Sequence, residues 1–202
     1  MRFACAAPRL ALAAGMAALA ALAGCGTANP GVNLSPDFKA RSQAYAWNPP
    51  DDGAAGKSCR IRLTEIRDLR DDKEVMGSTG FGVVTAPDMP AWLNSGLQSL
   101  KRDKRIVIAD GPDADLDIGL DLIRAYMMHI TTDLSTNLVA RVHFTRHGAA
   151  TEDKLFRGAY TRVNWGNGKG EVQAAFDEAF EDLLKTLDSD IRARCAPVVT
   201  GT

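Results

Sequence analysis

Few side chains in this chain are spaced in a way that could support catalysis, and the most suggestive segment is a glycine-rich one. Gly53-Ala-Ala-Gly56-Lys57-Ser58 has the residue types that end a phosphate-binding loop. The full pattern needs a glycine five positions before Gly56, where this chain has Asp51, and it needs a loop that follows a strand and opens a helix. This segment precedes a predicted strand, so we expect no phosphate-binding loop.

Acidic and imidazole side chains also fail to match metal-site patterns. Residues 113–119 carry three alternating aspartates, but a calcium loop needs Gly at its sixth position and Glu at its twelfth, where Ile118 and Arg124 stand. The chain has three histidines, His129, His143 and His147. No cysteine or glutamate cluster accompanies them at ligand spacing. We expect no metal, no cofactor and no catalytic residue, and hence no enzyme, although a triad of residues distant in sequence stays open.

The thiol with the clearest chemical role is that of Cys25. Residues 1–9 carry Arg2 and Arg9 and no acid, and a charge-free run follows from Leu10 to Leu22. This order is typical of a secretory signal. The run is shorter than the roughly 20 apolar residues that a membrane span needs.

The four residues Leu22, Ala23, Gly24 and Cys25 resemble the lipobox of bacterial lipoproteins. The resemblance implies that a signal peptidase recognises Leu22, Ala23 and Gly24, that residues 1–24 are removed, and that Cys25 carries fatty acyl chains such as palmitate. Two or more acyl chains are enough for stable anchoring. Gly26 stands where an Asp would favour the inner membrane, so the resemblance implies the outer membrane. An ordinary cleaved signal with an incidental Cys25 is the alternative.

Two further cysteines bracket the predicted domain. Cys5 is removed with the signal peptide and Cys25 carries the lipid, so Cys59 and Cys195 remain. Cys59 lies just before the first predicted strand, and Cys195 lies just after the last predicted helix. In an oxidising periplasm we expect them to form a disulfide. Two separate buried thiols are the alternative.

Composition and turn residues give the domain boundaries. Residues 1–24 hold two of the 24 basic residues and no acid, so the mature chain carries 22 basic against 25 acidic side chains, and no general nucleic-acid affinity follows. Residues 25–57 contain several Asn-Pro and Pro-Gly turn signals and few regularly spaced apolar residues, which predicts a flexible tether. Residues 58–196 then form one domain, and 197–202 a tail.

The first half of the domain mixes short strands with a helix. Alternation predicts strands over 60–66, 80–84 and 105–109. Between the first two we expect a solvent-exposed polar loop through Arg70. Asp88 is placed to cap a helix that runs to Leu100.

The second half predicts a meander of strands and a long helix. Residues 116–122 and 138–144 alternate cleanly, and pairing Leu122 with Ala140 and Ile118 with Phe144 keeps both apolar faces together. That register brings Asp121 near Arg141. A strand over 155–165 and an amphipathic helix over 171–191 follow. The fold class is therefore α+β, with two layers: a mainly antiparallel sheet and two amphipathic helices packed on one face.

The order of these features, with Asp115-Leu-Asp-Ile-Gly-Leu-Asp-Leu-Ile123 in the hairpin and Phe156-Arg-Gly-Ala-Tyr-Thr161 after it, resembles that of the YajG-like lipoproteins of Gram-negative bacteria. The PqiC-like auxiliary lipoproteins of ABC-type lipid transporters have a similar layout. The similarity covers roughly residues 59–193. It implies a tethered, non-enzymatic periplasmic domain, and for the second group a role in transport. The long tether and the Cys59/Cys195 pair depart from both groups.

These observations together predict a lipoprotein on the periplasmic face of the outer membrane that acts as a binding or assembly module of the cell envelope. We expect a protein partner or further copies of the chain, and no nucleic acid. An auxiliary component of ABC-type lipid transport is the alternative. A hydrolase that acts on envelope polymers is a third hypothesis.

Overall fold

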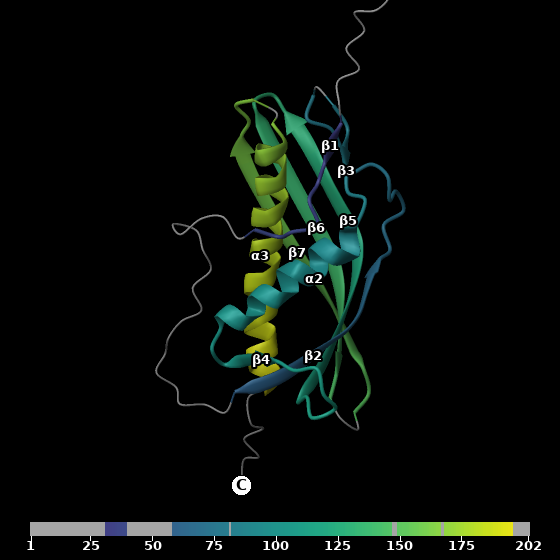
Figure 1. Cartoon of the computed structure of the whole chain (residues 1–202), viewed down its shortest axis with the longest axis vertical. Coiled ribbons are helices and arrows are strands. Elements are labelled where there is room, and N and C mark those ends of the chain that lie inside the picture. Colours follow the sequence, from purple (N-terminus) through teal and green to yellow (C-terminus); the bar gives the residue numbers. More distant parts are fainter. Residues whose placement is uncertain (1–30, 40–57, 81, 147–148, 167, 196–202) are drawn as a thin grey trace, which may run out of the picture. The chain divides into compact units, whose positions relative to one another are not determined.

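Alternating apolar and polar residues form one five-stranded sheet, which two helices cover (Figure 1). The computed structural model describes residues 31–39, 58–80, 82–146, 149–166 and 168–195, which all belong to one compact unit that begins at Gly31. In chain order the elements are β1 (Val32–Asn33), β2 (Cys59–Asp68), β3 (Val84–Thr85), α2 (Met89–Leu97), η2 (Gln98–Arg102), β4 (Ile106–Ile108), β5 (Leu116–Ile130), β6 (Asp133–Thr145), β7 (Glu152–Val163) and α3 (Lys169–Cys195).

The strand order in the sheet is β4-β2-β5-β6-β7. β5, β6 and β7 form an antiparallel meander, and the predicted hairpin register is confirmed, because Ile118 pairs with Phe144 and Leu122 with Ala140. β2 lies parallel to both β4 and β5, an arrangement that the sequence analysis did not anticipate. A crossover through α2 and η2 separates β2 from β4, and parallel neighbours require such a connection.

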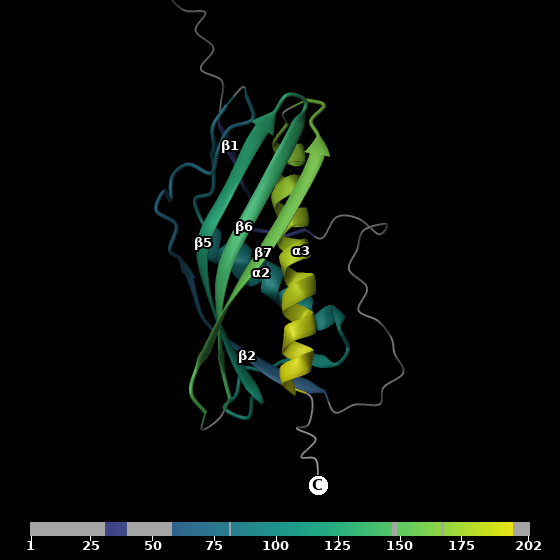
Figure 2. The ribbon, with the colours of Figure 1, turned by 180° about the vertical axis from the view of Figure 1, so that it is seen from behind.

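Both helices pack on one face of the sheet, as predicted, and the α+β fold class is confirmed. The Asp88 carboxylate caps α2 by accepting a hydrogen bond from the Ala91 backbone N–H at 3.0 Å. α3 buries its apolar stripe against β6 and β7. A methyl group on Gly158 of β7 would lie 2.0 Å from the Ala179 carbonyl oxygen, so this glycine allows the backbone of α3 to approach the strand. Figure 2 shows β5, β6 and β7 from the opposite side, where no helix covers them.

Residues 31–39 fold onto the domain, so the predicted tether is wrong for this segment. β1 pairs in parallel with β3, Leu34 is buried, and the Phe38 ring packs edge-on against Phe180 with ring centroids 5.6 Å apart. Val32, Leu34 and Phe38 alternate with polar residues, but Pro36 interrupts the run, and three apolar positions are too few to predict that the segment docks. Residues 40–57, the rest of the predicted tether, lie outside the described residues.

Candidate functional site

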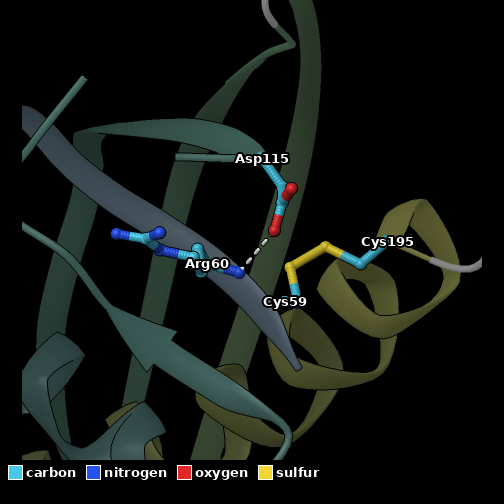
Figure 3. The surroundings of a disulfide bond; sticks show 4 residues. All are labelled: Cys59, Arg60, Asp115 and Cys195. Atoms are coloured by element: carbon cyan, nitrogen blue, oxygen red, sulfur yellow. Dashed lines mark hydrogen bonds between the residues drawn. A yellow bond between two sulfur atoms is a disulfide. The ribbon is translucent and has the colours of Figure 1, made fainter. Parts of the chain in front are cut away.

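The disulfide lies at one end of the sheet (Figure 3). It joins Cys59, the first residue of β2, to Cys195, the last residue of α3, with their Cα atoms 5.7 Å apart, and this is the pairing expected from the sequence. Beside it the Arg60 backbone N–H donates to the Asp115 carboxylate at 2.8 Å, which ties β2 to the turn before β5. The bond thus closes the long helix onto the sheet.

The residues expected to direct lipidation, Leu22, Ala23, Gly24 and Cys25, lie outside the described residues. Within the described part of the chain, no helix is both long and apolar enough to cross a bilayer.

A buried acidic pair lies in the same half of the domain as the disulfide. The side chain of Asp103 is 2% exposed and accepts hydrogen bonds from the backbone N–H, Nε and Nη2 of Arg105. The side chain of Asp188 is fully buried and lies 2.9 Å from Arg192 Nε. Burial is the main cause that raises the pKa of Asp188 to about 6; Arg192 opposes the rise and Asp103 adds to it. Burial also raises the pKa of Asp103, but the hydrogen bonds from Arg105 outweigh it and leave that pKa below its usual value. Burial thus favours the neutral form of the Asp188 carboxyl, whereas the hydrogen bonds from Arg105 favour the charged form of Asp103.

The uncovered face of the sheet carries a row of charged side chains across four strands. His143 Nε2 lies 2.9 Å from Asp121 and Nδ1 lies 2.6 Å from Asp153, while Arg67 donates two hydrogen bonds to Asp121. Gly119 pairs with His143 across the strands. The register prediction for Asp121 and Arg141 is confirmed, but the carboxylate binds Arg67 and His143 instead.

This row favours the protonated form of the His143 imidazole. Burial lowers the pKa of His143, but the hydrogen bonds to Asp121 and Asp153 outweigh it and raise that pKa above its usual value. Hydrogen bonds from Arg67 lower the pKa of Asp121. Because both ring nitrogens of His143 are engaged by carboxylates, neither is free to accept a proton from a substrate. The row stabilises charge on the sheet and does not have the geometry of a general base.

A pocket in the described part of the chain lies where β5 loses its parallel neighbour. The Leu69 backbone N–H donates to the Leu122 carbonyl at 2.9 Å, and the Met127 backbone N–H donates to the Met76 carbonyl at 2.7 Å. Between these two hydrogen bonds the loop takes seven steps along the chain (76 − 69) and β5 takes five (127 − 122). The longer loop must bow away from the strand, and the pocket, with a volume of about 310 Å³, lies in that interval.

A bulge in β5 helps to shape this pocket. The pairing of β5 with β6 shifts by one residue between Leu122 and Arg124, at Ile123. Bulges of this kind re-aim the side chains that follow them. The lining residues are Arg70, Asp71, Asp72, Val75, Ile123, Arg124, Ala125 and Tyr126.

Arg70 is the principal polar group of the pocket wall. The prediction that the loop through Arg70 is exposed is wrong at this residue, which is 4% exposed. Its Nε and Nη2 donate to the Asp68 carboxylate at 2.9 and 2.8 Å, and Nη2 also donates to the Lys73 carbonyl at 3.3 Å. Among the described residues Arg70 Nη1 has no hydrogen-bond partner although it is buried. A buried guanidinium with one nitrogen unsatisfied favours an added acceptor oxygen.

The groups around Arg70 are held in place by local interactions. Burial raises the pKa of Asp68, but the hydrogen bonds from Arg70 outweigh it, so the net shift is downward and the carboxylate stays charged. The Asp72 carboxylate accepts from the backbone N–H groups of Glu74 and Val75 at 2.9 and 2.8 Å, which fixes the turn. This site could not be predicted from the sequence, because an Asp-x-Arg sequence in a polar loop gives no sign of burial.

Arg124 and Tyr126 complete the pocket on the β5 side. The Arg124 guanidinium lies 5.9 Å from the centroid of the Tyr126 ring, a cation–π contact. Arg124 is exposed and Tyr126 half-buried. Together with Arg70 they place two arginines and one aromatic residue in the pocket lining. Elsewhere in the described chain no group of three or more His, Cys, Asp or Glu side chains is placed to hold a metal ion.

Comparison with known proteins yields a similarity of fold. No protein-family model matches the chain, and no curated protein matches it. The protein XCC0632 from Xanthomonas campestris, described as a member of family DUF330, superposes with a TM-score of 0.51 at 12% identity, over 69% of this chain and 86% of that one. The hypothetical protein CT253 from Chlamydia trachomatis superposes with a TM-score of 0.47 at 7% identity, over 67% of this chain and 99% of that one. A minor lipoprotein from Acinetobacter baumannii superposes with a TM-score of 0.44 at 12% identity, over 68% of this chain and 95% of that one. The chain thus has a fold like that of XCC0632.

Proposed function

We propose that this protein is a lipid-anchored, non-enzymatic binding module on the periplasmic face of the outer membrane, and that the Arg70 pocket is where it binds a protein partner. The observation that carries the proposal is the buried Arg70, whose Nη1 lacks a partner among the described residues and which lines a pocket of about 310 Å³. The lipobox-like sequence that ends at Cys25 supports the anchor. Gly26 supports the outer membrane over the inner one.

The chemistry of the pocket favours recognition of an acceptor oxygen beside an apolar group. Arg70 and Arg124 can donate hydrogen bonds to a carboxylate or a carbonyl, and an arginine fork binds a carboxylate in two-point geometry. Tyr126 and Val75 provide apolar surface beside them. A loop of a partner protein with an acidic side chain next to an aliphatic one has this combination of groups.

The lining residues support binding over catalysis. They comprise arginine, aspartate, tyrosine and aliphatic side chains, without a histidine, cysteine or serine that could serve as a base or nucleophile. Asp72, one of the two lining carboxylates, is already occupied by backbone N–H groups. These groups can hold a partner in place.

Photocrosslinking in intact cells tests the proposal. A photoreactive phenylalanine analogue replaces Tyr126 in the full-length chain, in otherwise unchanged protein and in two variants. Arg70→Lys keeps a positive charge beside Asp68 but removes Nη1, and Arg157→Lys makes the same change at an exposed position of β7. We expect a light-dependent protein adduct that Arg70→Lys reduces and Arg157→Lys leaves intact. An adduct of equal yield in all three proteins, or no adduct, contradicts the proposal.

A narrower assignment concerns the two lipoprotein groups that the sequence resembles. The order of lipobox, strand, helix and hairpin, with residues 115–123 and 156–161, supports a YajG-like lipoprotein first and a PqiC-like transport auxiliary second. Genes for an ABC-type lipid transporter next to this one would favour the second. Normal lipid trafficking in a deletion strain would count against it.

A further inference from the structure

One end of the domain carries a cluster of exposed apolar side chains, which we call the apolar tip. Its members are Val83, Met128, Ile130, Val163 and Trp165, with exposed fractions of 45, 50, 51, 46 and 83%. Ile130, Asp133 and Val163 are consecutive in one row across β5, β6 and β7. Trp165 lies two residues after Val163, the last residue of β7. Large apolar residues gathered in this way, with one tryptophan almost fully exposed, mark an interaction surface.

The turn that presents Trp165 is fixed by hydrogen bonds. The backbone N–H groups of Trp165, Gly166 and Gly168 all donate to the Glu171 carboxylate, at 3.2, 2.9 and 3.4 Å. The Asn164 backbone N–H also donates to the Thr132 carbonyl of the β5–β6 turn at 2.7 Å. Trp165 is therefore held outward by a well-bonded turn.

The chain enters the domain at this same end. The Val32 backbone N–H donates to the carbonyl of Val83, a member of the apolar tip, at 2.7 Å, and Gly31 lies against that same carbonyl. In Figure 1 β1, the ends of β5 and β7 and the first turn of α3 lie together at the upper end, and the C-terminal end of α3 lies at the lower one. The helix α3 has 27 residues and so measures about 40 Å between these ends.

The length of chain before Gly31 connects the apolar tip to the membrane. Gly31 follows Cys25 by six steps along the chain, and six steps span at most about 20 Å. If Cys25 carries the lipid, Gly31 lies within that distance of the bilayer surface. The C-terminal end of α3 lies about 40 Å from the apolar tip, which is about twice the span of the segment from Cys25 to Gly31. A lipid on Cys25 would therefore hold the apolar tip, and not the disulfide end, close to the membrane.

We propose that the apolar tip inserts into the interfacial region of the bilayer and that Trp165 is its anchor residue, an inference that rests on the proposed lipidation of Cys25. Tryptophan is enriched at membrane interfaces because its ring is apolar and its N–H is polar. Arg162 and Lys169 flank the tip together with Asp133 and Glu171, so the charges balance and insertion depends on the apolar side chains. Insertion sets the orientation of the domain, with the disulfide end away from the membrane.

Depth-dependent fluorescence quenching tests this inference. The full chain is expressed, processed in the cell and reconstituted into vesicles of phosphatidylethanolamine and phosphatidylglycerol that contain nitroxide-labelled lipid. A fluorescent amino acid replaces Trp165 in one protein and Val107 in a control. Val107 is 42% exposed and pairs with Arg60 beside the disulfide, so it tests an apolar residue at the opposite end. We expect the lipid quencher to reduce emission at position 165 several times more than at position 107.

Three results would overturn the inference, and they separate it from the proposed function. Equal quenching at both positions, in protein that carries lipid at Cys25, would contradict insertion of the apolar tip but would be consistent with the proposed lipid anchor. A blue shift at position 165 without lipid quenching would assign the tip to another protein or to a second copy of this chain. Absence of lipid on Cys25 would overturn the proposed anchor, and the inference with it.

Discussion

Removal of the Cys59–Cys195 disulfide should lower the free energy of unfolding by about 4–5 kcal/mol. The bond joins residues 136 positions apart, and the entropy that a cross-link removes from the unfolded chain grows with the logarithm of loop length. At 25 °C this relation gives about 5 kcal/mol for such a loop. Total stabilities of domains are about 5–15 kcal/mol, so the loss is a large share.

Urea unfolding of the oxidised protein, of Cys59→Ala, of Cys195→Ala and of the double variant measures this contribution. Each single variant abolishes the same cross-link, so the three losses should agree within about 1 kcal/mol, and the urea dependence should steepen because the unfolded chain becomes more open. Single losses that add up in the double variant would mean that the cysteines contribute by packing alone. A double variant that loses less than about 1 kcal/mol would refute the reasoning from loop entropy.

Three other changes test the packing and the buried charges. Gly158→Ala should cost about 3 kcal/mol of unfolding free energy because the new methyl group meets the backbone of α3, whereas Gly111→Ala, with no atom within 4 Å, should leave thermal stability unchanged or slightly raised. The His143 row should contribute its full stability below about pH 6.5 and lose it as the pH rises through the raised pKa of the folded state. The urea midpoint of the unchanged protein should therefore fall as the pH rises above about 6.5, whereas that of His143→Gln should stay level. Asp188, with a pKa raised to about 6, should make stability fall as the pH rises from about 4 to about 6, and Asp188→Asn should abolish this fall and add about 1–3 kcal/mol at neutral pH.

The elements that the sequence predicted well are those whose signal is local. The hairpin register followed from alternation in two strands, the start of α2 from a single capping aspartate, Asp88, and α3 from an unbroken helical stripe. The pairing of Cys59 with Cys195 followed from the count of cysteines left after the signal. Each of these depends on spacing within one segment or on a process of elimination.

The features that were missed depend on contacts between segments distant in sequence. The parallel placement of β2 depends on a crossover, and the docking of residues 31–39 depends on a partner strand of two residues. The burial of Arg70 results from a loop that is two residues longer than the strand beside it. Asp121 binds Arg67 and not Arg141, because the sheet topology places β2 next to β5 and pairs Arg67 with Asp121.

The mass of the N-terminal peptide from membrane-derived protein tests the central claim most directly, since both the anchored binding module and the apolar tip depend on it. The account predicts that this peptide begins at Cys25 and carries a thioether-linked diacylglyceryl group and an amide-linked acyl chain. A peptide that still contains residues 1–24, or that begins elsewhere with an unmodified Cys25, would contradict it.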